Sequence, residues 1–452
     1  MNLIEKYNVA GPRYTSYPTV PFWEDQNFTL NSWKEQLKKS FAESNKTEGI
    51  SVYIHLPFCE SLCTFCGCNK RITKNHDVET PYINAVIAEW ELYCEMLGEK
   101  PIVKELHLGG GTPTFFSVKN LQLLMKGIFK FAERHPEAEF SFEGHPNNTT
   151  EQHLKILGKL GFTRVSFGVQ DYNPAVQKAI HRIQPFENVR KVTNWAREAG
   201  FTSIGHDLVF GLPFQTAEDI VQSIMRTKEL MPDRIAFYSY AHVPWIKGNG
   251  QRGFKEEDLP DASEKRLMYE IGKKMLQESG YVEIGMDHFA LKTDSLYKAL
   301  EEKKIHRNFM GYTSSKTKVM IGLGVSAISD CWYGFAQNAK GVEEYESLVC
   351  NGILPVYRGH ILNEEDLIIR KHILNLMCKM ETSWEQLPDY IPEIRDIKNR
   401  LLEMSLDGVV EMGDHGLKIP QSGRPFVRNV CMAFDLRLQR QKPDTQLFSM
   451  TI

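Results

Sequence analysis

The feature that most constrains the fold is a regular alternation of short apolar segments with longer amphipathic ones between residues 50 and 240. Strands are predicted at residues 50–56, 105–108, 139–143, 164–169, 203–210 and 234–240. Helices are predicted between them, at residues 80–98, 118–133, 150–160, 173–179, 186–199 and 217–230. Because strands that alternate with helices of this length form parallel βαβ units, the sequence predicts a barrel-like α/β core.

Polar residues or glycines mark the ends of five predicted strands. They are Gly110, Glu143, Gln170, Asp207 and Tyr240, separated by 27 to 37 residues, about one βα unit each. In parallel α/β barrels the carboxyl ends of the strands form the mouth of the active site. We therefore expect a site that is assembled from successive units at one end of the barrel.

The segments on either side of this core follow other patterns. The first 48 residues contain the stretch Pro12-Arg-Tyr-Thr-Ser-Tyr-Pro18 and an amphipathic helix at residues 30–44. Further helices are predicted at residues 262–279, 364–379, 391–404 and 425–440, with a short strand pair at 409–419. We expect four parts: an N-terminal segment that covers the substrate site (1–48), the barrel core (49–285), a core extension (286–360), and a small, mainly helical, winged-helix-like C-terminal domain (361–452).

The composition is that of an ordinary globular protein. Apolar residues make up 42% and charged residues 25% of the 452 residues, and the formal net charge is -3. No broad basic face for nucleic acid and no run of about 18 apolar residues for a membrane helix is present. We expect a cytoplasmic protein with no nucleic-acid or membrane partner, and without an interface motif we expect a monomer.

Four of the nine cysteines, Cys59, Cys63, Cys66 and Cys68, lie within ten residues. Three thiolates with the spacing C-x3-C-x2-C can hold a [4Fe–4S] cluster and leave one iron open to a substrate or cofactor. A structural zinc site usually takes two separated ligand pairs, and a ferredoxin cluster uses a distant cysteine, so these alternatives are less favoured. The remaining cysteines are predicted to be small buried hydrophobes: Cys94, Cys331, Cys350, Cys378 and Cys431.

This cysteine loop, placed directly after the first predicted strand, resembles the radical S-adenosylmethionine superfamily. The stretch Pro12–Pro18 and several others resemble the oxygen-independent coproporphyrinogen III oxidases within it. These others are Cys66-Gly-Cys-Asn-Lys70, Gly168-Val-Gln-Asp-Tyr172, Tyr240-Ala-His-Val-Pro244, Gly285-Met-Asp-His-Phe-Ala290, Gly311-Tyr-Thr313 and Gly322-Leu-Gly-Val-Ser-Ala-Ile-Ser329. The resemblance continues to Arg428-Asn-Val-Cys-Met-Ala-Phe434 and so covers essentially the whole chain.

The resemblance implies a partial (β/α)6 TIM-like barrel that binds a [4Fe–4S] cluster and S-adenosylmethionine, two molecules per turnover. It also implies anaerobic oxidative decarboxylation of two propionates of coproporphyrinogen III to vinyls, which gives protoporphyrinogen IX in haem biosynthesis. The propionate β-C–H carries no acidic proton, so a carbon radical must abstract that hydrogen, and the cofactor supplies it. A small reductant protein such as flavodoxin or ferredoxin is the expected electron donor.

The resemblance carries over to individual positions. It implies that Cys59, Cys63 and Cys66 hold the cluster, and that Cys68 and His55 act at the reaction site, with Cys68 not bound to iron. The implied S-adenosylmethionine contacts are Tyr53, Phe65, Gly110, Gly111, Thr112, Glu143, Gln170, Arg182, Asp207, Ala241 and Ile328. The candidate cations for the substrate propionates, chosen because they lie near these motifs, are Arg13, Lys70, Arg71 and Arg307.

Other interpretations stay open at this point. Polar strand faces, tight turns and surface charges are ordinary explanations for several of these residues. A haem chaperone on the same barrel is the alternative function, although such relatives typically lack the fourth cysteine and the Pro12–Pro18 stretch; a radical enzyme that acts on another tetrapyrrole is a third. The chain also has Met310 where the family usually has glutamine, and a thioether cannot replace the hydrogen bonds of an amide.

Overall fold

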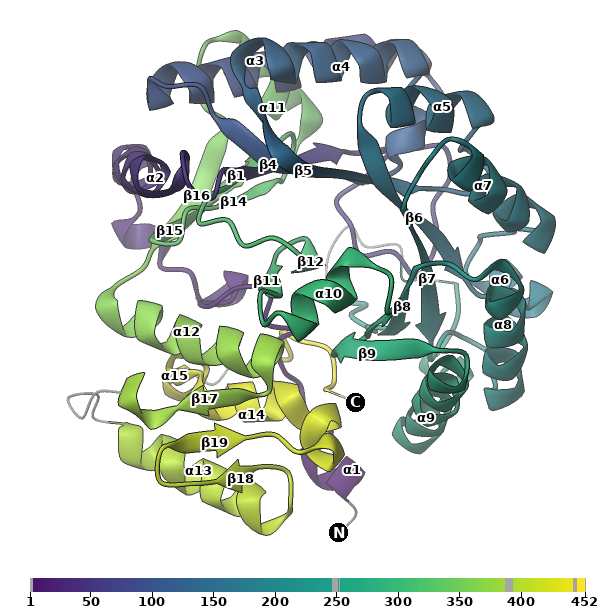
Figure 1. Ribbon diagram of the computed structural model, residues 1–452, viewed down its shortest axis with the longest axis vertical. Helices are drawn as coiled ribbons and strands as arrows, with labels where there is room; N and C mark the ends of the chain where they lie inside the picture. Colours follow the sequence, from purple (N-terminus) through teal and green to yellow (C-terminus); the bar gives the residue numbers. More distant parts are fainter. Residues whose placement is uncertain (1–2, 246–250, 252, 387–392, 442–444, 452) are drawn as a thin grey trace.

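The computed structural model describes residues 3–245, 251, 253–386, 393–441 and 445–451. Six parallel strands curve into an open arc, and helices cover its outer side (Figure 1). The strands are β1 (Ile50–Leu56), β4 (Ile102–Gly110), β5 (Glu133–Gly144), β6 (Phe162–Gln170), β7 (Ser203–Phe210) and β8 (Arg234–Ser239). The helices that follow them are α3 (Glu79–Leu97), α4 (Val118–Phe131), α5 (Glu151–Lys159), α6 (Pro174–Ala179), α7 (Phe186–Glu198), α8 (Ala217–Leu230) and α9 (Ala262–Glu278). The predicted partial (β/α)6 barrel is confirmed.

The alternation of side chains along β1 separates two environments, as expected for a strand with a period of two residues. Val52, Ile54 and Leu56 are fully buried in the main hydrophobic core. Tyr53 and His55 instead line a cavity inside the arc. The parallel register of the six strands places their carboxyl ends along one edge, where the predicted site residues lie.

The sheet extends beyond the six barrel strands and contains 12 strands in all. The strand and turn predicted at residues 280–289 are part of this extension. On one side β13 (Met320–Leu323) pairs in parallel with β1 and is followed by three antiparallel strands. These are β14 (Ile328–Asp330), β15 (Gly334–Asn338) and β16 (Val356–Ile361). On the other side antiparallel β10 (His288–Leu291) and β9 (Tyr281–Gly285) extend the sheet beyond β8. These strands have only three to six residues each, too few for a clear period-2 pattern, and β13 joins the sheet by pairing with β1, far away in the chain.

Two predicted helix boundaries are wrong. The helix predicted to reach residue 133 ends at Phe131, because Glu133 begins β5. The single helix predicted at residues 425–440 is divided into α14 (Val427–Phe434) and α15 (Leu436–Arg440). Asp435 separates them because its backbone is not helical and its carboxylate accepts a hydrogen bond from the N–H of Leu438, which caps the second helix.

The C-terminal region combines helices with a small antiparallel sheet (Figure 1). The helices α12 (Glu364–Lys379) and α13 (Ile394–Leu406) pack with α14 around a second hydrophobic core. The predicted strand pair is a sheet of three strands in the order β17 (Glu381–Ser383), β19 (Gly416–Lys418) and β18 (Glu411–Met412). The start of the helix predicted at residues 391–404 falls partly outside the described residues. None of the described helices has the length and apolar character needed to cross a bilayer.

The N-terminal segment joins the C-terminal region to the barrel. Its helix α1 (Leu3–Tyr7) packs against α9, and Lys6 of α1 pairs with Glu403 of α13 at 2.8 Å. The helix α2 (Leu30–Ser44) packs against β15 and β16 (Figure 1). Between them, Tyr14 and Tyr17 bury their rings in the C-terminal core. The Tyr14 hydroxyl donates a hydrogen bond to Asp435 at 3.0 Å.

A single guanidinium connects residues near both ends of the described chain. Arg428 donates hydrogen bonds to the carbonyls of Gly11, Pro12 (2.9 Å) and Met450 (2.9 Å). An isolated β-bridge between Ala10 and Met450 runs beside it. The N-terminal segment is therefore held against the C-terminal region next to the carboxyl ends of the barrel strands.

Candidate active site

The cysteine loop follows β1 and lies at the carboxyl end of the arc. Two short strands, β2 (Phe58–Cys59) and β3 (Arg71–Ile72), pair at its base. In the middle of the loop, Thr64 donates its backbone N–H to the carbonyl of Ile180 (3.0 Å) and its hydroxyl to that of Ala179 (2.9 Å). The loop is thus fastened to the end of α6 as well as to β1.

A cavity of about 180 Å³, here called the cysteine cavity, opens between this loop and the strand ends. Twelve of the predicted site residues line it. They are Cys59, Cys63, Phe65, Cys66, Cys68, Gly110, Gly111, Thr112, Glu143, Gln170, Arg182 and Asp207. Residues from four different strand ends and the loop therefore meet at one place.

Each of the three predicted cluster ligands has a distinct polar neighbour. The sulfur of Cys59 lies 3.2 Å from the Thr112 hydroxyl, and Arg182 donates a hydrogen bond to the sulfur of Cys63 at 3.6 Å. A hydrogen bond from the Cys68 thiol lowers the pKa of Cys66 to about 6, and the same bond raises the pKa of Cys68 well above its usual value. Cys66 thus favours the thiolate that a metal requires, whereas Cys68 favours the thiol.

The donor set fits a [4Fe–4S] cluster better than a single ion. The three thiols line one cavity, and all nine cysteines of the chain are free of disulfides. Within the described residues, no three His, Cys, Asp or Glu side chains are close enough together to hold one metal ion. A four-iron cluster takes one thiolate per iron, so its ligands lie further apart than those that share a single ion. Cys59, Cys63 and Cys66 would hold three irons in this way.

Glycines at the end of β4 let the strand approach β1 very closely. A Cβ on Gly110 would lie 2.8 Å from the His55 ring, and the backbone there has a φ of 113°, which disfavours any other residue. A Cβ on Gly111 would lie 2.5 Å from the carbonyl oxygen of Pro57. The backbone N–H of Gly111 donates to the carbonyl of Leu56 at 2.8 Å, which fixes this arrangement.

A second cavity of about 240 Å³, here called the tyrosine cavity, adjoins the first. Tyr53, His55 and Ile328 line it, and Cys68, Gly110 and Glu143 line both cavities. Because a carbonyl oxygen can only accept a hydrogen bond, Nε2 of His55 carries the proton and donates to the Asn69 carbonyl (2.8 Å). In the neutral ring Nδ1 is then the acceptor, and it accepts a hydrogen bond from the Tyr53 hydroxyl (3.1 Å). Burial lowers the pKa of His55, which agrees with this neutral form of the ring.

Glu143, in the wall shared by the two cavities, is held as a carboxylate. Its Oε1 accepts from Nε2 of His107 and its Oε2 from the backbone N–H of Gly110, both at 3.3 Å. Desolvation by the surrounding strands opposes ionisation, but these hydrogen bonds outweigh it and lower the pKa of Glu143. The cavities therefore contain one fixed negative charge close to the cysteine loop.

Asp207 and Arg182 also line the cysteine cavity. Burial raises the pKa of Asp207 to about 7, although the Ser166 hydroxyl donates to its carboxylate at 2.8 Å. Arg182 donates to the carbonyl of Gly168 at 2.6 Å. A Cβ on Gly168 would lie 2.6 Å from the amide nitrogen of Gln170, so this glycine makes room for both side chains. The alternative that Arg182 is an ordinary surface charge is wrong, because its guanidinium contacts the sulfur of Cys63.

Ala241 is the one predicted contact that lines neither cavity. It lies close to the site nevertheless, because the Gln251 amide donates to the carbonyls of both Ala241 (2.8 Å) and Phe65 (3.2 Å).

The four candidate cations occupy different places. Lys70 lines the cysteine cavity and donates to the carbonyls of two residues of the loop. Arg71 forms an exposed ion pair with Glu343, and buried Arg307 donates to backbone carbonyls of the N-terminal segment. Arg13 pairs with Asp287 at 3.1 Å. Only Lys70 and Arg13 are therefore at cavities near the strand ends.

Sequence reasoning missed several residues of the site. His145 and Asn148 line the cysteine cavity, and Phe309 lines the tyrosine cavity together with Met310, which stood out in the sequence only as a departure from the family. His145 and Asn148 directly follow the end of β5, so their position after Glu143 was the available signal. No local signal identified Phe309, because it reaches the cavity from a loop between β11 (His306–Asn308) and β12 (Gly311–Thr313).

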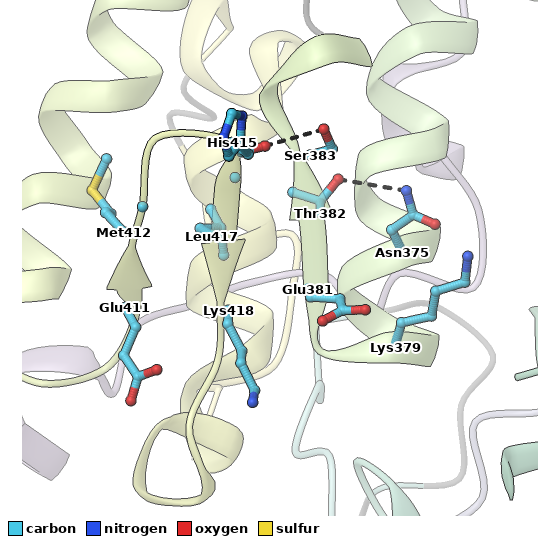
Figure 2. A pocket seen from close by; sticks show the side chains of 12 residues that line it. Asn375, Lys379, Glu381, Thr382, Ser383, Glu411, Met412, His415, Leu417 and Lys418 are labelled. Atoms are coloured by element: carbon cyan, nitrogen blue, oxygen red, sulfur yellow. Dashed lines mark hydrogen bonds between the residues drawn. The ribbon is translucent and has the colours of Figure 1, made fainter.

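A separate groove lies over the C-terminal sheet, far along the chain from these residues (Figure 2). Lys379, Glu381, Glu411 and Lys418 place charges of both signs along it, and Ser383 donates to the carbonyl of His415 at 3.1 Å. It is open and contains no cysteine, so the two cavities at the strand ends are the better candidates for the active site.

Comparisons with known proteins agree with this geometry. The model of the radical SAM superfamily matches residues 53–226. The oxygen-independent coproporphyrinogen III oxidase of Escherichia coli (strain K12) is 38% identical, with 100% of this chain and 98% of that protein covered. That of Synechocystis sp. is 35% identical, with 100% and 97% covered. The solved structure of the Escherichia coli coproporphyrinogen III oxidase, a radical SAM enzyme, matches with a TM-score of 0.87 and 35% identity, over 94% of this chain and 97% of that one.

Proposed function

The chain belongs to the oxygen-independent coproporphyrinogen III oxidases of the radical SAM superfamily, and on this premise we propose its reaction and the roles of its residues. It converts two propionate side chains of coproporphyrinogen III to vinyl groups by anaerobic oxidative decarboxylation and so produces protoporphyrinogen IX for haem biosynthesis. The observation that carries this proposal is the convergence of the three ligand cysteines with nine other predicted site residues at one cavity, in a chain that resembles these enzymes along its whole length.

The bound [4Fe–4S] cluster and S-adenosylmethionine would supply an electron and a 5′-deoxyadenosyl radical, which removes hydrogen from an unactivated propionate carbon. Cys59, Cys63 and Cys66 hold the cluster. The close approach of Gly110 and Gly111 to β1 leaves backbone groups accessible to the cofactor, and Glu143 offers it a negative charge.

Arg182 and Asp207 complete the lining of the cofactor site. The Arg182 guanidinium faces Cys63, so it stabilises negative charge on this side of the loop. In the tyrosine cavity, the hydrogen bonds of Tyr53 and His55 to one another and to the loop keep both rings in place beside Cys68. The two adjoining cavities support the proposal of two S-adenosylmethionine molecules per turnover.

We also propose how the chain meets its partners. Glu60, Ser61 and Leu62 are exposed on the cysteine loop, which leaves a path for a small reductant protein such as flavodoxin or ferredoxin. The N-terminal segment, residues 1–48, covers the substrate site, supported by the position of Arg13 beside the strand ends. We place a monomeric enzyme in the cytoplasm, where its nine free cysteines would stay reduced.

The test is anaerobic incubation of the reconstituted enzyme with S-adenosylmethionine, a reductant and coproporphyrinogen III. We expect two CO2 per tetrapyrrole and matching 5′-deoxyadenosine. Cys63→Ala should lose cluster iron and all cofactor cleavage, whereas Cys68→Ser should keep its iron. Tight haem binding without CO2 release would favour a haem chaperone, and normal iron in Cys63→Ala would show that the ligand assignment is wrong.

A further inference from the structure

A third cavity, of about 60 Å³, lies at the carboxyl ends of β7 and β8. The last residue of each strand, Phe210 and Ser239, lines it. The other side is formed by cationic residues that come from three distant parts of the chain. They are Arg13, Lys265, Arg266, Arg424 and Arg428, with Asp287 as the one carboxylate. We call this the cationic cavity.

The positive charges of this cavity are only partly neutralised. Arg13 pairs with Asp287, Arg266 with Glu270, and Arg424 with Glu283. The Nζ of Lys265 has a carbonyl, that of Tyr240, at 3.4 Å, and Arg428 donates to backbone carbonyls. Within the described part of the chain, no carboxylate forms an ion pair with either of these two cations.

Cations without a counter-charge are costly to bury. Burial, together with the charge of Arg13, lowers the pKa of both Lys265 and Arg428. An anion in the cavity would remove this cost, and the volume limits its size. A space of about 60 Å³ accommodates one carboxylate group and is too small for a macrocycle.

The cationic cavity and the cysteine cavity are both lined by residues of β7. Asp207 lines the cysteine cavity, and Phe210, which pairs with Ser239 of β8, lines the cationic cavity. The charges of Asp207, Glu143, Asp287 and Arg13 all act on Tyr238 of β8. Its neighbour Ser239 accepts a hydrogen bond through its carbonyl from Arg13 at 2.8 Å. A substrate with several carboxylates could therefore place one of them here while another part of it lies at the cysteine loop.

We propose that the cationic cavity binds one side-chain carboxylate of coproporphyrinogen III while a different propionate reacts at the cysteine cavity. This inference rests on the proposed function and adds the group that anchors the substrate. Lys265 makes the principal contact, because its ammonium has three N–H donors and the structure gives it one distant acceptor. Arg13 supplies a second cation next to it, and Arg428 holds the N-terminal segment that carries Arg13.

The test replaces Lys265 with methionine, which keeps the length and apolar character of the side chain and removes its charge. Loss of one charge-assisted hydrogen bond should raise the KM for coproporphyrinogen III roughly ten- to hundredfold with little change in kcat. Lys265→Arg should recover most of the affinity. The matched control is Lys274→Met on the same helix, since Lys274 is exposed and should leave both parameters unchanged.

Two further measurements separate anchoring from other roles. Iron content and substrate-independent cleavage of S-adenosylmethionine should match the wild type in Lys265→Met, and fluorescence titration with coproporphyrin III should show the same loss of affinity. An unchanged KM, or a fall in kcat without a change in KM, would overturn the inference. A wild-type enzyme that releases no CO2 would instead overturn the proposed function. Lys265→Gln serves if the methionine variant does not fold.

Discussion

The ionisation of Asp207 should control the affinity for S-adenosylmethionine near neutral pH. The pKa of this carboxyl is raised to about 7. Burial and the charge of Glu143 raise it, and the hydrogen bond from Ser166 and the cations Arg182 and Arg164 offset part of this rise. Glu143 has a lowered pKa of its own and stays ionised. Asp207 is therefore the member of this group whose charge changes around pH 7.

The size of the effect follows from the titration. S-adenosylmethionine is a cationic sulfonium, so it should bind the ionised form of Asp207. With a pKa of about 7, roughly one tenth of the carboxyls is ionised at pH 6 and roughly nine tenths at pH 8. The apparent Kd should therefore be about tenfold higher at pH 6 than at pH 8, a difference of about 1.4 kcal/mol, and should level off above pH 8.

Anaerobic equilibrium dialysis with labelled S-adenosylmethionine between pH 5.5 and 8.5 measures this profile on the reconstituted protein. Asp207→Asn should abolish the pH dependence. Ser166→Ala removes the hydrogen bond that stabilises the carboxylate, so its midpoint should move to higher pH. Iron content, followed at each pH, is the control for loss of the cluster. A flat profile for the wild type, or a tenfold change that persists in Asp207→Asn, would refute the reasoning.

Two other substitutions test the packing that supports the site. In Gly110→Ala the new Cβ would overlap the His55 ring, so the affinity for S-adenosylmethionine should fall at least tenfold. Gly98 also has a positive φ, but no atom lies within 4 Å of its Cβ position, so Gly98→Ala should cost only about 1–2 kcal/mol of stability. Equal affinities for S-adenosylmethionine in the two variants would contradict the role of Gly110. Arg437→Met takes the guanidinium away from buried Asp366, which keeps only His360 and the backbone N–H of Asn363 as partners. It should lower the free energy of unfolding by about 3–5 kcal/mol in urea titration, whereas Arg440→Met, at an exposed ion pair, should cost about 1 kcal/mol or less. Similar losses in these two would argue against the buried pair.

The barrel and much of its mouth were predictable because their signals are local. The apolar runs of β1 and β7 match the predicted residues 50–56 and 203–210, since both are buried strands flanked by polar turns. Glu143, Gln170 and Asp207 could be grouped because parallel strands bring their carboxyl ends together. Strand length was predicted less well: β5 begins six residues before the predicted start, among charged residues that no apolar pattern identifies.

Features that depend on distant pairing escaped prediction. The strands β13 to β16 have few residues each, and the partner that stabilises β13 lies more than 260 residues away, in β1. The cationic cavity joins Arg13, Lys265 and Arg428, which share no motif or spacing. Tyr53 and His55 were placed correctly on one strand face, but their hydrogen bond to one another, and the contact of His55 with Asn69, depend on how the loop returns to β1.

The contacts of Arg428 have a consequence for the order of biosynthesis. Its guanidinium binds the carbonyls of Gly11, Pro12 and Met450, so these contacts cannot all form until residue 450 has left the ribosome. The six βα units are complete more than 150 residues earlier. We therefore expect a nascent barrel whose mouth is still uncovered, and an interval in which iron and sulfide can be delivered to the cysteine loop before the N-terminal segment closes over it.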